Sequence, residues 1–98
     1  MRHTYQETTG IVLVEVHKNF IDFSKVYYQN YFYELKINNP KLYDNLFFDT
    51  NGHAPFSQDL ESILRDLFIS GLVDFDRKLT LNGVEEAKEL IESEKELQ

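Results

Sequence analysis

One stretch near the middle of the chain, residues 54–83, contains both the clearest helix and the clearest turns in the sequence. Ser57 stands where a helix N-cap is expected, and Gly71 stands where that helix should stop. Between them, apolar residues recur at the i, i+3, i+4, i+7, i+8 spacing of one buried helical face: Leu60, Ile63, Leu64, Leu67 and Phe68. The sequence therefore predicts a central helix over about residues 57–70.

Two short runs of alternating apolar and polar residues follow within residues 72–81, separated by Asp76 and Arg77. Alternation of this kind, interrupted by a short polar turn, is typical of a small antiparallel hairpin. Thr80 stands where a further helix can start. We expect that helix to be acidic and to cover about residues 83–95, because the last part of the chain carries six Glu and two Lys.

Residues 10–20 fit two interpretations. A helix would place Val12, Leu13, Val16 and Phe20 on one face, but it would leave Ile11 and Val14 on the opposite side. The β-branched composition also suits a strand. We favour the helix, because the fold inferred below needs a helix ahead of the central one.

Residues 20–37 hold seven of the fourteen aromatic residues in the chain. Ser24 can cap a helix here, with a buried stripe formed by Phe23, Tyr27, Tyr31 and Leu35. Tyr28, Phe32 and Tyr33 lie off that stripe. One interpretation is a second core contact; the other is a surface for a protein partner or a second copy, where Tyr and Phe are enriched. We predict Tyr28, Phe32 and Tyr33 as candidate partner-binding residues.

Pro40 should end the aromatic helix and open a short turn. Residues 46–48 are a candidate edge strand beside the hairpin. Residues 49–55 form the strongest turn signal in the chain and should be a surface loop. Together these elements predict a single α+β domain over residues 1–98. Its expected fold is a small winged helix-turn-helix-like one, with three to four helices and a two- or three-stranded antiparallel wing.

The run P-F-S, then L-x-x-x-L-x-x-L and G-L-V, then L-T-L-N-G before a helix, resembles the winged-helix regulators of the PadR type. It is also similar to the small winged-helix-related domains of SocA-like (Panacea) antitoxins. The resemblance covers about residues 46–92 and concerns core and turn positions. In PadR-type regulators it implies that the helix matching residues 57–70 enters the DNA major groove and that the hairpin near Asp76 and Arg77 is the wing.

The charges on the outer face of the central helix argue against DNA. The candidate DNA contacts are Gln58, Ser62, Arg65, Arg77 and Lys78. Asp59, Glu61 and Asp66 flank the helix positions, and the chain has a net charge of −7. Because DNA binding depends heavily on Lys and Arg that neutralise phosphates, we expect weak affinity for duplex DNA.

Composition and motifs exclude several other classes. No apolar run approaches the roughly 20 residues of a membrane span, and the N-terminus lacks the apolar core of a signal peptide. Without cysteine the chain has no disulfide or thiol chemistry, so we expect a cytoplasmic protein. The histidines His3, His17 and His53 are scattered, and neither a phosphate-binding glycine loop nor a nucleophile motif is present. We expect no cofactor and no metal.

The sequence therefore predicts a small non-enzymatic regulatory or interaction protein that acts mainly by protein–protein binding. It would be antitoxin-like or inhibitor-like, for example from a phage or mobile element. The alternative is a transcriptional regulator that binds DNA as a dimer. The Glu-rich C-terminal helix is either a solvated face or a negative surface that imitates nucleic acid.

Overall fold

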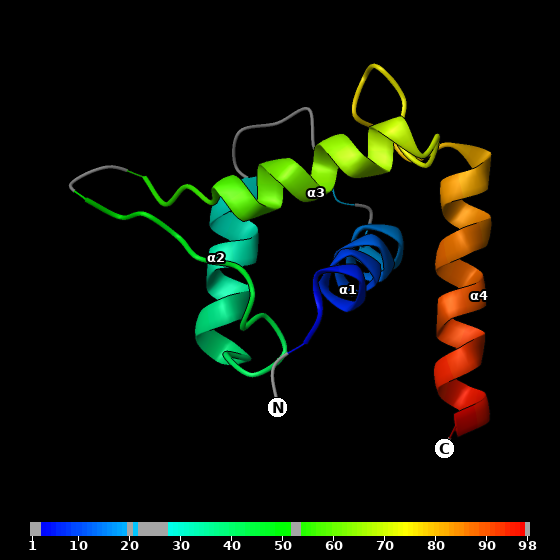
Figure 1. The fold of residues 1–98 in the computed structure, drawn as a ribbon, viewed down its shortest axis with the longest axis horizontal. Coiled ribbons are helices and arrows are strands. Elements are labelled where there is room, and N and C mark those ends of the chain that lie inside the picture. Colours follow the sequence, from blue (N-terminus) through cyan, green and yellow to red (C-terminus); the bar gives the residue numbers. More distant parts are fainter. Residues whose placement is uncertain (1–2, 20, 22–27, 52–53, 98) are drawn as a thin grey trace.

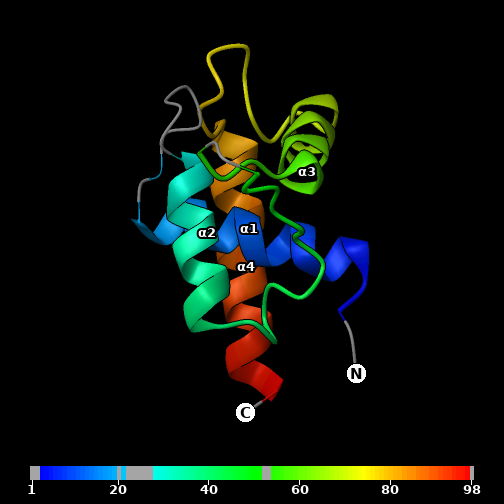
Figure 2. The same ribbon diagram turned by 90° about the vertical axis from the view of Figure 1, so that its left-hand side faces the viewer.

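The computed structural model describes residues 3–19, 21, 28–51 and 54–97, and its architecture is a bundle of helices. The helices in these ranges are α1 (Tyr5–Asn19), α2 (Tyr28–Asn38), α3 (Gln58–Ile69) and α4 (Leu81–Leu97). Helix α1 runs between α2 and α4, and α3 lies across the ends of those two helices (Figures 1 and 2).

The predicted α+β fold with an antiparallel wing is wrong. In the described ranges, β-type pairing is limited to two isolated bridges, one between Val73 and Leu79 and one between Asp49 and Phe56. The first lies where we expected the hairpin. Eleven residues, 70–80, separate the end of α3 from the start of α4. Pairing within them stops at this one bridge, because the chain turns directly after it and the Asp74 carboxylate accepts the N–H groups of Asp76 and Lys78.

The candidate edge strand at residues 46–48 is also absent. The chain instead closes a separate loop, in which the N–H of Asp49 donates to the carbonyl of Phe56 at 2.7 Å and the N–H of Phe56 donates back at 3.0 Å. This loop projects beyond the N-terminal end of α3, whereas the 72–80 loop follows its C-terminal end (Figure 1). The two segments therefore cannot pair into one sheet.

Helix α3 begins and ends where predicted. The hydroxyl of Ser57 accepts a backbone N–H of the first turn at 3.1 Å and so caps the helix. At the other end Gly71 adopts a φ of 78°. The N–H of Gly71 donates to the carbonyl of Phe68 at 3.0 Å, and the N–H of Leu72 donates to that of Leu67 at 2.9 Å. These two bonds form a Schellman motif, which satisfies carbonyls that the helix end would otherwise leave unpaired.

The predicted buried face of α3 is confirmed at four of its five positions. Leu60, Ile63, Leu64 and Leu67 are all buried. Phe68, the fifth, is 40% exposed, so the prediction was wrong for that residue.

The helical interpretation of residues 10–20 is confirmed, and the helix starts earlier than expected, at Tyr5. Thr4 and Glu7 fix this start: the Thr4 hydroxyl accepts the Glu7 N–H at 3.1 Å, and the Glu7 carboxylate accepts the Thr4 N–H at 2.8 Å. This reciprocal pair is a capping box. The core face comprises Val12, Leu13 and Val16, while Phe20 lies outside the described residues.

Three tyrosine hydroxyls connect the helices in pairs by donating to carboxylates. The pairs are Tyr5 with Asp66 at 2.6 Å, Tyr31 with Glu15 at 2.7 Å, and Tyr28 with Glu61. They join α1 to α3, α2 to α1, and α2 to α3 respectively. Each is a charge-assisted hydrogen bond, the stronger class of such contacts in proteins.

The side chain of Gln29 connects α2 to the start of α3 at a buried position. Its amide oxygen accepts the backbone N–H of Ser57 at 2.8 Å, and its amide nitrogen lies 3.4 Å from the Ser57 carbonyl oxygen and donates to it. Both residues are buried, with Ser57 fully so. Since a buried polar group without a partner is costly, this pairing makes the burial of the α3 N-cap possible.

Thr80 and Gly83 join the end of α3 to the start of α4. The Thr80 hydroxyl donates to the carbonyl of Gly71 at 2.7 Å and accepts the N–H of Gly83 at 3.1 Å, so it caps α4. Gly83 is buried, and a Cβ placed on it would lie 2.1 Å from the carbonyl oxygen of Leu72. Only glycine fits at this contact between the two segments.

We expect Gly83→Ala to destabilise the protein by about 1–3 kcal/mol or more, because its methyl group would overlap backbone that cannot move freely. Gly10→Ala is the matched control. A Cβ on Gly10 would lie 3.4 Å from a methyl group of Leu90, which is an ordinary contact. Alanine there should therefore stabilise α1 by roughly 0.5–1 kcal/mol. Urea denaturation of the two variants would contradict the fold if the two substitutions shifted stability in the same direction.

Burial and the neighbouring carboxylates raise the pKa values of Tyr5, Tyr28 and Tyr31 to about 12. The pKa of a tyrosine is near 10 in the unfolded state. A tyrosine whose pKa is higher in the folded state stabilises that state, and the stabilisation is complete at pH values below the unfolded pKa. That stabilisation is lost as the pH rises through about 12.

Denaturant midpoints measured from pH 9 upward should therefore fall across this range, and Tyr31→Phe should lessen the fall because it removes one titrating hydroxyl. Tyr33 lies outside the three pairs, so Tyr33→Phe controls for the loss of a tyrosine hydroxyl as such. Identical slopes for wild type and Tyr31→Phe would contradict the role given to these pairs.

Candidate functional site

The predicted partner-binding aromatics are mostly core residues. Tyr28 is 4% exposed and Phe32 is fully buried, where its ring meets Tyr43 edge to face with centroids 6.2 Å apart. Tyr33 is half-buried and packs edge to face on Phe48 at 5.4 Å. The expectation that these rings lie outside the buried face of α2 is therefore wrong for Tyr28 and Phe32. Tyr33 is partly exposed, and binding of a partner at these residues stays a prediction from the sequence.

The error arose from the helix phase. Positions spaced by four residues are rotated by about 40° at each step of a 3.6-residue helix. The four positions of the expected stripe therefore do not share one face of the helix. Helix α2 starts at Tyr28, and the proposed cap Ser24 and the first two stripe positions, Phe23 and Tyr27, lie outside the described residues. The remaining two stripe positions, Tyr31 and Leu35, are only partly buried against the core.

The candidate DNA contacts lie on the outer face of α3 and on the loop that follows it. Gln58, Arg65, Arg77 and Lys78 are exposed, and Ser62 is half-buried. Acidic side chains accompany them, as expected. Asp66, which follows Arg65 in sequence, accepts the hydroxyl of Tyr5 at 2.6 Å.

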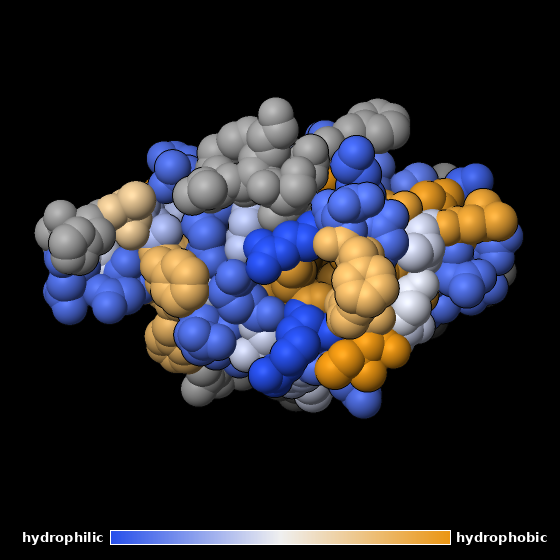
Figure 3. All heavy atoms as spheres, turned by 90° about the horizontal axis from the view of Figure 1, so that it is seen from above, coloured by the Kyte–Doolittle hydropathy of each residue, from blue (hydrophilic) through white to orange (hydrophobic). Residues whose placement is uncertain are grey.

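The C-terminal end of α3 and the loop after it carry a cluster of exposed apolar side chains, which was not predicted from the sequence. Phe68, Ile69 and Phe75 are 40%, 72% and 91% exposed. The two phenylalanine rings meet edge to face with centroids 5.0 Å apart. Figure 3 shows hydrophobic side chains gathered over the C-terminal end of α3 and the loop beyond it. We call Phe68, Ile69 and Phe75 the α3-end patch.

The loop that carries Phe75 is held in one shape by its own hydrogen bonds. One carboxylate oxygen of Asp74 accepts the N–H groups of Asp76 and Lys78 at 2.9 and 3.1 Å. The N–H of Asp74 donates to the carbonyl of Lys78 at 2.9 Å, and Arg77 closes the turn with a φ of 60°. Non-glycine residues seldom occupy this left-handed region. The loop therefore presents Phe75 on a fixed support.

A groove of about 430 Å³ lies on a different part of the surface, along α1. Its apolar lining comes from three segments: Gly10, Ile11 and Val14 of α1, Leu42 and Tyr43 of the turn after α2, and Leu90 of α4. The lining of the groove also contains polar side chains, including Glu7, Glu15 and Lys18. The sequence signal for this groove was the pair Ile11 and Val14, which faced away from the core side of the predicted helix.

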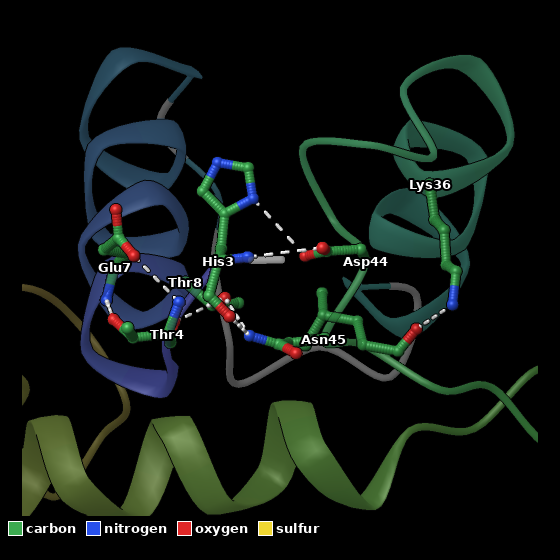
Figure 4. A network of polar contacts seen from close by, with 8 residues as sticks. His3, Thr4, Glu7, Thr8, Lys36, Asp44 and Asn45 are labelled. Carbon is green, nitrogen blue, oxygen red and sulfur yellow. Dashed lines mark hydrogen bonds and ion pairs between the residues drawn. The ribbon is translucent and has the colours of Figure 1, made fainter. Parts of the chain in front are cut away.

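Hydrogen bonds hold one wall of this groove, where the turn after α2 meets the start of α1 (Figure 4). A ring nitrogen of His3 lies 3.3 Å from one carboxylate oxygen of Asp44. The backbone N–H of His3 donates to the other oxygen of that carboxylate at 3.2 Å. The amide of Asn45 donates to the carbonyl of His3 and to the hydroxyl of Thr8, the latter at 3.2 Å. The wall is therefore fixed before any ligand binds.

The described residues form neither a candidate metal site nor a candidate membrane span. No group of three or more His, Asp or Glu side chains among them could hold a metal ion. No helix in the described ranges is both long enough and apolar enough to cross a membrane.

Comparisons of the chain with protein-family models, with curated proteins and with solved structures find no match. The resemblance to PadR-type regulators and SocA-like antitoxins thus stays a prediction from the sequence.

Proposed function

We propose that this protein is a non-enzymatic interaction module that binds another protein through the α3-end patch. The observation that carries the proposal is the exposure of Ile69 and Phe75, at 72% and 91%. Clustered apolar side chains left in water are unfavourable, and such clusters commonly mark binding surfaces. A partner that covered them would remove this cost.

The support under the patch favours binding. Because the Asp74 hydrogen bonds already fix the loop, little conformational entropy would be lost when Phe75 enters a pocket of the partner. An aromatic residue at the centre of such a contact often contributes a large part of the affinity. The arrangement suits an anchor residue on a fixed scaffold.

The charges around the patch favour a protein over DNA. Arg77 and Lys78 are exposed in the same loop as Asp74 and Asp76, and exposed Arg65 lies one turn before Ile69 in α3. Both signs of charge therefore occur around the apolar centre. A mixed polar rim around an apolar centre is the usual anatomy of a protein interface. A DNA-binding face would need a surplus of cations to neutralise phosphates.

Photo-crosslinking in the native host tests the proposal. The crosslinking amino acid p-benzoylphenylalanine in place of Phe75 should give an adduct of defined mass with a partner protein. The same amino acid in place of Phe47 is the matched control, because Phe47 is 62% exposed and lies near the N-terminal end of α3. Ile69→Glu should suppress the Phe75 adduct, since it places a charge in the apolar centre.

Two results would contradict the proposal. One is the absence of an adduct from position 75, or equal adducts from positions 75 and 47. The other is a submicromolar complex with duplex DNA in fluorescence anisotropy that weakens steeply with salt and is lost in Arg77→Ala but retained in Ile69→Glu. That pattern would identify the cations as the binding groups and support the DNA-binding alternative.

A further inference from the structure

The groove along α1 is separate from the α3-end patch and has its own chemistry. Ile11 and Val14 are half-buried on the side of α1 away from the fully buried Val12, and they form part of the groove lining. Gly10 has no side chain, so the methyl groups of Leu90 in α4 come close to the backbone of α1. The result is an apolar floor with a wall on each side.

The length of the groove suits a helix. Its lining includes Gln6, Gly10, Val14 and Lys18, which succeed each other at every fourth residue of α1. At 1.5 Å per residue these positions span about 18 Å, or more than three helical turns. A helix laid in such a groove can place apolar side chains on the floor from successive turns.

The charges around the groove are predominantly negative. Glu7 and Glu15 line it from α1. Exposed Glu86 precedes Leu90 by one turn of α4, and exposed Glu89 adjoins it in sequence. Lys18 is the cation of the α1 lining. The carboxylate of Glu15 is oriented by the hydroxyl of Tyr31 at 2.7 Å and the amide of Asn19 at 2.8 Å.

We infer that this groove binds an amphipathic helix of a partner protein, with apolar side chains over Val14 and Lys or Arg beside the glutamates. Charge complementarity selects this occupant. A second copy of α4 would bring more glutamates to an acidic groove, and like charges at an interface are unfavourable. The opposite charge on the partner would also speed the encounter at low salt.

The test uses a synthetic peptide of about 14 residues, roughly four turns of helix, with leucines on one face and lysines on the flanks. A second peptide replaces every lysine by glutamate. Fluorescence anisotropy with the full-length protein should show binding of the lysine peptide, weakening as salt is added, and no binding of the glutamate peptide.

Substitutions locate the site. Val14→Lys places a like charge on the floor and should weaken the lysine peptide about tenfold or more. Gln6→Lys lies on the exposed edge of the groove, cannot disturb the core, and should also weaken binding. Thr50→Lys changes the net charge by the same amount in an exposed loop and should leave affinity within about twofold. Equal losses in all three variants would show attraction by net charge alone and would overturn the inference.

Amide shifts in NMR spectra give an independent readout. The lysine peptide should shift Gly10, Val14 and Leu90, and should leave Ile69 unaffected. Shifts centred on Ile69 would overturn the groove as the site, as would binding of both peptides with equal affinity. Ile69→Glu should bind the lysine peptide as wild type does, so the outcome for the groove is independent of the outcome for the α3-end patch.

Discussion

The pairing of the Gln29 side chain with the backbone of Ser57 is the interaction on which the arrangement of helices depends. The start of α3 lies inside the protein, and its backbone groups would be costly to bury alone. Gln29 supplies both a donor and an acceptor for them. This contact sets α2 against α3, which lets Tyr28 reach Glu61 and places the ring of Phe32 in the core.

The two surfaces proposed for binding lie on different parts of the helix bundle. The Schellman motif at Gly71 and the cap at Thr80 leave a short loop that folds back on itself and exposes Phe75 beside the end of α3. On another side of α1, Gly10 and Val14 line the groove together with Leu90 of α4. The proposed binding of a partner protein rests on the first of these surfaces, and the inferred binding of an amphipathic helix rests on the second.

The sequence predicted features that depend on residues close together in the chain, and it did not predict contacts between distant residues. Ser57, Gly71 and the leucine face of α3 were identified correctly because capping and periodicity act within one or two turns. The partner of Ser57 lies 28 residues away, so no local pattern reveals Gln29. The wing was predicted from alternation alone, but the segment between α3 and α4 pairs only at one isolated bridge. The aromatic surface was predicted from a helix phase that placed Phe32 outside the core.

Hydrogen exchange at the backbone N–H of Ser57 tests the role of Gln29 most directly, because this N–H donates to the Gln29 side chain at 2.8 Å. We predict that it exchanges only when the whole protein unfolds, as slowly as the N–H groups in the middle of α3, and that Gln29→Ala removes this protection. Rapid exchange in the wild type, or protection that is unchanged in Gln29→Ala, would contradict the claim that this contact holds α2 to α3.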